Sequence, residues 1–209
     1  MRRRTLLKTL LAPALAPMLV GALPRLAVAE TMDAAKLLED RVLGRADAPV
    51  TVIEYASFTC SHCARFHAET LPRLKTAYID TGKVKFVFRD FPFDRPALEA
   101  GMMARCVQPE RYFGLIGAIF QTQNGWSRAA DPRAALAQLG RQAGIDQAAF
   151  DACVGNGALM DGILKIRLEG EQKHKIDSTP SFVIGDKKVS GALPFEEFEK
   201  LIVPLLPKS

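Results

Sequence analysis

The sequence predicts an α/β fold in which an all-helical segment separates a β-α-β half from a β-β-α half. A strand, a helix and a second strand follow one another over residues 50–88. Residues 96–175 then have helical apolar spacing, and residues 181–205 have the pattern of a hairpin followed by a helix. We therefore expect an α/β domain built from residues 30–95 and 176–209, with residues 96–175 inserted as a helical domain.

The first half contains two strands that we expect to pair in parallel. Before them, residues 32–40 indicate a short helix and residues 41–49 a loop or short edge strand. The run Val50-Thr51-Val52-Ile53 is β-branched throughout, which is typical of a strand covered on both faces. Residues 60–80 follow with helical spacing, and residues 84–88 form the next strand. A strand-helix-strand unit of this length favours a right-handed crossover.

The second half predicts a helical block and a hairpin. Five helix-breaking or turn residues interrupt the Ala-rich insertion and indicate four or five short helices: Pro109, Gly125, Pro132, Gly144 and Gly155. Residues 181–184 and 187–190 are expected to be strands joined around Gly185-Asp186, which is a hairpin signal, and a last helix is expected near residues 194–205.

Residues 1–29 have the three parts of a secretion signal: a basic start, an apolar stretch over residues 10–23 and a small-residue cleavage site. We expect cleavage after Ala29 and a final location outside the cytoplasm. The alternative is a membrane anchor, but three prolines interrupt the stretch, and it is shorter than the ~20 apolar residues of a spanning helix. Residues 3–8 (RRTLLK) also match the twin-arginine pattern, so two export routes stay open.

The formal net charge of +5 comes from this N-terminal segment. It contains five of the 28 Lys and Arg residues and no acid, so the remaining 23 basic residues balance the 23 acidic ones. A balanced body has no electrostatic footprint for phosphates, and no Lys/Arg cluster interleaved with aromatics occurs. We expect no nucleic-acid partner.

The segment Cys60-Ser61-His62-Cys63 lies where the first strand passes into the helix. The free N–H groups of a helix N-terminus favour a thiolate, so Cys60 is predicted to be the nucleophile. Cys63 lies one turn further and is expected to resolve a mixed disulfide by attacking Cys60. The imidazole of His62 can donate to the Cys60 thiolate or, when protonated, offset its charge. A stabilised thiolate would make the protein an oxidant of its partners.

Two further residues are candidates for this site. Glu54 is the one charged residue in an apolar strand, and burial of a lone carboxyl is costly. We predict that it is a proton acceptor with a raised pKa that serves Cys63 through water; the alternative is a strand-end residue facing solvent. Thr179-Pro180 precedes the third strand, where a proline shapes the backbone. A cis bond is the sharper hypothesis, and a trans bond is the alternative that X-Pro sequences adopt far more often.

A metal site is the main alternative for the cysteine pair, because Cys60, Cys63 and His67 have the spacing of zinc or copper ligands. A fourth ligand is missing, and no second Cys-x-x-Cys occurs. We therefore expect no metal and place His67 on the helix surface.

Taken together, these segments resemble the DsbA-like periplasmic thiol–disulfide oxidoreductases, and the resemblance spans about residue 41 to the C-terminus. It rests on residues 54–63 (EYASFTCSHC), residues 88–92 (FRDFP), the helical insertion and residues 178–182 (STPSF). The resemblance implies a thioredoxin-like fold, no cofactor, and a redox-active Cys60–Cys63 disulfide. It also implies that Thr179-Pro180 is cis and packs against Cys60 in the substrate groove, and that Glu54 is the buried acid.

Two details of the resemblance concern the loop and the other cysteines. The member after which the family is named resembles this chain but has Pro-His between its two cysteines. Ser61-His62 here keeps the histidine and lacks the proline ring that stiffens the loop, and this difference bears on the oxidising strength. Because some members have a second bridge in the helical insertion, we predict a structural Cys106–Cys153 disulfide, with two unlinked buried thiols as the alternative.

Three functions follow as hypotheses. The first is an oxidase that passes its disulfide to unfolded exported proteins with free thiols and is reoxidised by a membrane quinone-linked, DsbB-like partner; we expect a monomer. Exposed phenylalanines such as Phe58 are expected to help bind unfolded chains. The second is a reductase or disulfide isomerase of the same fold. Proteins with those activities that resemble this family usually carry a separate N-terminal dimerisation domain, and residues 30–49 are too short for one. The third is a copper or zinc carrier.

Overall fold

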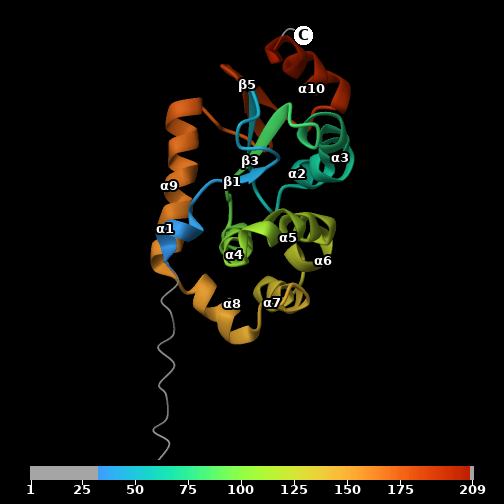
Figure 1. Cartoon of the computed structure of the whole chain (residues 1–209). Helices are drawn as coiled ribbons and strands as arrows, with labels where there is room; N and C mark the ends of the chain where they lie inside the picture. Colours follow the sequence, from blue (N-terminus) through green and yellow to red (C-terminus); the bar gives the residue numbers. More distant parts are fainter. Residues whose placement is uncertain (1–32, 208–209) are drawn as a thin grey trace, which may run out of the picture. The chain divides into compact units, whose positions relative to one another are not determined.

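The computed structural model describes residues 33–207 of the chain (Figure 1). The predicted signal segment, its cleavage site after Ala29 and the N-terminal start of the helix expected at residues 32–40 lie outside the described residues. Within them, that helix is shorter than expected, α1 (Ala34–Leu37). No helix of residues 33–207 is both long and apolar enough to span a membrane.

A five-stranded mixed sheet forms the centre of the described chain, in the order β1-β3-β2-β4-β5. Its strands are β1 (Arg41–Leu43), β2 (Val50–Ala56), β3 (Val84–Asp90), β4 (Ser181–Ile184) and β5 (Lys187–Ser190). Strands β2 and β3 are parallel, with Val50 opposite Val84, and all other neighbours are antiparallel. The predicted parallel pair, the edge strand and the hairpin are therefore confirmed.

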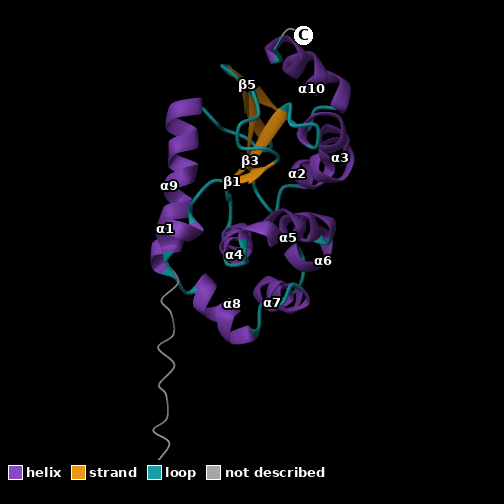
Figure 2. Cartoon of the chain, in the orientation of Figure 1, coloured by secondary structure: helices purple, strands orange, loops and turns teal. Residues whose placement is uncertain are grey.

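Helices cover both faces of this sheet (Figure 2). Alternate residues of β2 face opposite layers, as the two-residue period of a strand requires. Ile53 and Tyr55 point towards the side of α9 (Gly157–His174), where Gly170 leaves room for the Tyr55 ring. Val52 and Ala56 belong to the core on the other side, together with Phe66, Phe86 and Phe198. Glu54 shares the second face with them, so its carboxyl points into the core.

The helix predicted at residues 60–80 is one continuous run with two wide turns. Regular segments α2 (Ser61–Arg65) and α3 (Leu71–Leu74) alternate with π-helical segments η1 (Phe66–Thr70) and η2 (Lys75–Ile79). Pro72 lies just after the first wide turn, and because it has no N–H it cannot donate a hydrogen bond back along the helix. Helix α10 (Phe195–Ile202), ending in η3 (Val203–Leu205), packs beside this run.

The insertion contains six helices, so the prediction of four or five short ones is wrong. They are α4 (Arg95–Arg105), α5 (Pro109–Gln121), α6 (Gln123–Ser127), α7 (Pro132–Gln142), α8 (Gln147–Val154) and the 18-residue α9. Gly125 lies inside α6, and the break falls at Thr122 instead. The side chain of Gln123 donates to the carbonyl of Phe58, and that of Trp126 donates to the carbonyl of Ile119. These hydrogen bonds fix the break, and apolar spacing in the sequence does not reveal them. The division of the chain into two domains stays a prediction.

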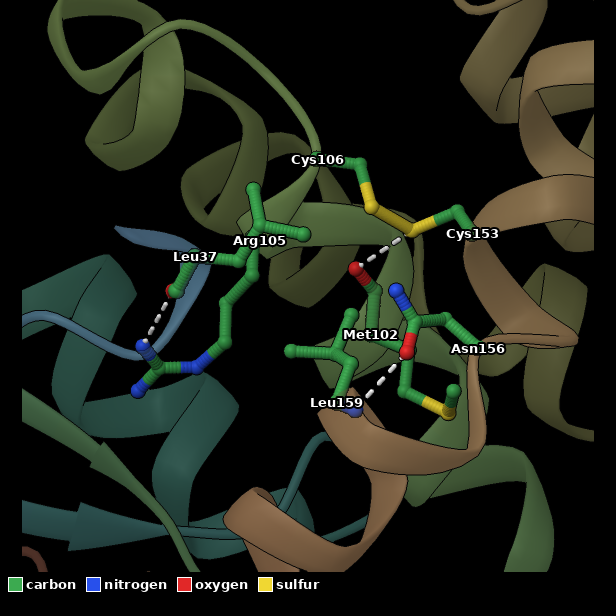
Figure 3. The surroundings of a disulfide bond; sticks show 7 residues. All are labelled: Leu37, Met102, Arg105, Cys106, Cys153, Asn156 and Leu159. Carbon is green, nitrogen blue, oxygen red and sulfur yellow. Dashed lines mark hydrogen bonds between the residues drawn. A yellow bond between two sulfur atoms is a disulfide. The ribbon is translucent and has the colours of Figure 1, made fainter. Parts of the chain in front are cut away.

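The predicted second disulfide joins Cys106, at the end of α4, to Cys153 in α8 (Figure 3). Their Cα atoms are 6.3 Å apart, within the usual range for a disulfide. Cys153 Sγ also lies 2.9 Å from the carbonyl oxygen of Met102; because the bonded sulfur carries no proton, this is a close contact and not a donated hydrogen bond. The bridge fixes α8 against the end of α4.

A buried ion pair ties α4 to the sheet. Arg105 Nε donates to Asp90 Oδ2 at 2.7 Å, and both side chains are almost fully buried. Arg105 Nη1 also donates to the carbonyl of Leu37, as Figure 3 shows. Gly101 lies against the Asp90 carboxylate, and a Cβ at this position would come within 2.5 Å of Asp90 Oδ1. The ion pair therefore depends on the glycine.

Candidate active site

The two cysteines of the Cys60-x-x-Cys63 segment occupy different environments at the end of β2. Cys60 is the N-cap of α2 and is half-buried, whereas Cys63 is fully buried one turn later. The turn between β2 and α2 is closed by the N–H of Cys60, which donates to the carbonyl of Ser57 at 3.0 Å. Both sulfurs are free thiols in this structure. A partner therefore reaches Cys60 first.

Their pKa values are displaced in opposite directions. The thiol of Cys63 donates a hydrogen bond to the Cys60 sulfur, and this contact is the main cause that lowers the pKa of Cys60 to about 5. The neighbouring Thr179 and the backbone N–H groups of Cys63 and His62 lower it further. Burial opposes this shift. Burial is also the main cause that raises the pKa of Cys63 well above its usual value, followed by its hydrogen bond to Cys60 and the charge of Glu54. Cys60 is thus a stable thiolate, and Cys63 holds its proton.

The Thr179-Pro180 bond is cis, as predicted, and adjoins Cys60. The Cys60 thiol lies 3.3 Å from the Thr179 carbonyl oxygen, to which it donates when protonated. Ser181 Oγ donates to the Ser178 carbonyl at 2.8 Å and holds this loop at the start of β4. The β-β-α half of the fold therefore supplies one wall of the site.

Glu54 lies beneath the cysteine pair and is fully buried, so its carboxyl does not face solvent. Burial raises the pKa of this carboxyl, while the neighbouring imidazole of His67 lowers it in part. Oε2 lies 2.8 Å from His67 Nε2, and Oε1 has no hydrogen-bond partner among the described residues. A buried carboxyl whose pKa is raised can accept a proton from a neighbouring group and release it again.

The prediction that His67 lies on the helix surface is wrong. Its side chain is only 4% exposed, and the ring packs 4.2 Å from the ring of Phe120 on α5. The sequence did contain a signal for this position. Cys63 and His67 are four residues apart on one helix and so share a face, and a buried Cys63 directs His67 towards Glu54.

The imidazole of His62 is exposed and turns towards Arg65, with Nδ1 3.2 Å from Nη2. Its backbone N–H, by contrast, is directed at the Cys60 sulfur. Ser61 is also exposed at the start of α2. In this structure the loop between the cysteines thus stabilises the thiolate through its backbone.

Two contacts that the sequence did not predict hold the loop before Cys60 against the insertion. The buried Gln123 side chain donates to the carbonyls of Phe58 and Cys60, at 2.7 and 3.0 Å. Thr59 Oγ1 donates to Asp94 Oδ2 at 2.7 Å, and Asp94 also caps α4 by accepting from the N–H of Ala97.

The expectation of an exposed Phe58 is wrong, because its ring is buried against Phe88 and Phe120.

One atom of the alternative metal site at Cys60, Cys63 and His67 has another partner in this structure. His67 Nε2, which would be the third ligand atom, is engaged with Glu54. Among residues 33–207, no group of three or more His, Cys, Asp or Glu residues is arranged to hold a metal ion.

Comparisons with known proteins agree with this chemistry. The thioredoxin family model matches residues 36–203. The crystal structure of alpha-DsbA1 from Wolbachia pipientis superposes with a TM-score of 0.74 at 34% identity, over 80% of this chain and 90% of that one. The chain belongs to the DsbA-like thiol–disulfide oxidoreductase family. BdbD from Bacillus subtilis shares the DsbA-like fold, with a TM-score of 0.72 at 23% identity over 79% of this chain and 92% of that one.

A relative from Rickettsia is also named for thiol–disulfide chemistry. A Rickettsia bellii protein named as a protein-disulfide oxidoreductase is 32% identical over 146 residues, which are 69% of this chain. The chain spans 56% of the length of that relative. The predicted thioredoxin-like fold with a helical insertion is shared with these DsbA-like structures.

Proposed function

We propose that this chain is a protein disulfide oxidase that donates a Cys60–Cys63 disulfide to exported proteins with free thiols in the periplasm. The observation that carries the proposal is the asymmetry of the pair: Cys60 is the half-buried N-cap of α2, whereas Cys63 is fully buried and donates to the Cys60 sulfur, which lowers the pKa of Cys60. A dithiol whose outer sulfur is a stable thiolate at neutral pH favours the reduced state and so makes its disulfide a strong oxidant.

The reaction consists of two thiolate attacks. A client thiolate attacks Cys60 Sγ, the Cys60–Cys63 bond breaks, and Cys63 leaves as a thiolate that takes up a proton. A second client thiolate then attacks the client sulfur of the mixed disulfide, which forms the client disulfide and releases Cys60 as a thiolate. Two electrons pass from the client to the cysteine pair, and Glu54 supplies the proton that Cys63 gains.

The surroundings of Cys60 assign roles to its neighbours. Thr179 is partly exposed where a client chain would lie beside Cys60 and offers a backbone carbonyl there, and the buried cis Pro180 supports it from beneath. Ser61 and His62 are exposed on the other side and are accessible to the same client. In this proposal a quinone-linked, DsbB-like membrane protein reoxidises the pair, and the chain acts as a monomer.

The test is oxidation of a reduced, unfolded model protein by the oxidised chain, with free thiols counted over time. Stoichiometric loss of client thiols is expected for the wild type and for a Cys106→Ala/Cys153→Ala control. Cys60→Ala is expected to lose the activity, and Cys63→Ala to accumulate a client joined to Cys60. Rearrangement of scrambled disulfides without net thiol oxidation would identify an isomerase and overturn the proposal.

A further inference from the structure

The buried pair Glu54–His67 extends from beneath the cysteines to a cavity of about 610 Å³ on the side of α5 and α6. The imidazole of His67 lines this cavity together with Ala64, Gly117 and Phe120. The exposed side chains of Arg65 and Asn124 border it, so water has access from outside. His67 therefore connects the buried carboxyl to this cavity.

Cys63 is fully buried, so the proton that it exchanges during the reaction needs a path to solvent, which this arrangement can provide. Each time the Cys60–Cys63 bond opens, Cys63 must gain a proton, and each time it closes, Cys63 must lose one. The charge of Glu54 acts on Cys63, and the carboxyl is buried as well, so it too needs a route to water. Its Oε2 is bound to His67, while Oε1 has no partner among residues 33–207.

We propose that His67 is a positioning residue that acts through Glu54, passing protons between the carboxyl and water in the cavity. An imidazole suits this position because it can accept a proton on one ring nitrogen and release one from the other. In the opening direction, a proton moves from water to His67, then to Glu54 and to the leaving Cys63 thiolate. In the closing direction, the same path runs in reverse.

The groups that face this pair determine its pH dependence. Cys60, the N-cap of α2, and Cys63 within α2 interact electrostatically with Glu54, and so does the phenol of Tyr112 on α5. Arg65 and Glu69 border the cavity on the side of the active-site helix. Strand β3 presents the uncharged Phe88 to the imidazole, and α6 presents the uncharged Asn124 to the cavity. Among residues 33–207, His67 is thus the residue that brings an imidazole to this cavity.

The inference rests on the proposed function, and its test separates the two sulfurs. Reduced protein is mixed with oxidised glutathione, quenched with acid at intervals and analysed by mass spectrometry. The first phase, glutathionylation of Cys60, reports the nucleophile. The second phase, closure of the Cys60–Cys63 bond with release of glutathione, requires Cys63 to lose its proton.

His67→Gln keeps a polar group near Glu54 and removes the imidazole. We expect an unchanged first phase and a second phase at least about tenfold slower at pH 7, with a rate that now rises continuously with hydroxide concentration. Added imidazole is expected to restore the second phase of His67→Ala. The matched control is His174→Gln, which removes the histidine beside Tyr55 and is expected to behave as wild type.

A double-mutant cycle tests whether the two residues act in series. Glu54→Gln/His67→Gln is expected to close no more slowly than Glu54→Gln alone. A wild-type rate and pH profile in His67→Gln, or losses that multiply in the double variant, would overturn the relay. If the wild type itself does not close the Cys60–Cys63 bond, the proposed function fails, which is a separate result.

Discussion

The sulfur of Cys60 lies 3.3 Å from the carbonyl oxygen of Thr179, although 119 residues separate them in the sequence. Cys60 belongs to the β-α-β half and Thr179 to the β-β-α half, so the reactive atom lies at the contact between the two halves. The helical insertion holds the same loop from a third side through Gln123. The reactivity of Cys60 therefore depends on the whole fold.

The lowered pKa of Cys60 predicts how the stability of the reduced protein depends on pH. A group whose pKa is lower in the folded state stabilises that state above its unfolded pKa, and this contribution is lost as the pH falls through the folded value. For Cys60 the window runs from about 9.0, the ordinary thiol value, down to about 5. Urea unfolding under reducing conditions should show the wild type gaining stability over Cys60→Ser between pH 5 and pH 9. A pH-independent difference would contradict the lowered pKa.

The Cys106–Cys153 bridge is expected to stabilise the insertion without taking part in exchange. It closes a segment with a sequence separation of 47, and loop-closure entropy for such a length corresponds to about 4 kcal/mol. Cys106→Ala/Cys153→Ala should lose up to this amount of unfolding free energy in urea titrations. The rate at which Cys60 is glutathionylated should stay the same. A double variant as stable as the wild type would show that the bridge is not structural.

Gly101→Ala is expected to be strongly destabilising because its Cβ would displace the Asp90 carboxylate from Arg105. Disruption of a buried ion pair typically costs about 3–5 kcal/mol. The matched control is Gly114→Ala on α5, where a Cβ has no atom within 4 Å and where alanine should add up to about 1 kcal/mol of helix stability. Thermal unfolding of both variants measures the contrast. Equal melting temperatures would mean that the ion pair tolerates the added methyl group.

Local patterns in the sequence were sufficient to predict most of the sheet. The β-branched run of β2 and the Gly185-Asp186 turn have periods and turn chemistry that are independent of distant contacts. The disulfide and the cis Thr179-Pro180 bond could be predicted only from the family resemblance, since spacing alone does not give Cα distances or peptide isomers.

Long-range contacts explain the failures. His67 looked like a surface residue because its pairing with Glu54 depends on how the active-site helix packs against β2. Phe58 looked exposed because its neighbours, Phe88 and Phe120, come from two other elements. Gln123 gave no signal at all, since a glutamine in a helix is common and its carbonyl partners lie more than 60 residues away.

The redox equilibrium of the Cys60–Cys63 pair with glutathione tests the central claim most directly. The fraction of oxidised protein is measured across a series of ratios of reduced to oxidised glutathione at pH 7. Stabilisation of the Cys60 thiolate predicts a reduction potential above about −200 mV, closer to the oxidant DsbA at about −120 mV than to thioredoxin at about −270 mV. A potential near or below the thioredoxin value would contradict the oxidase and identify the chain as a reductant.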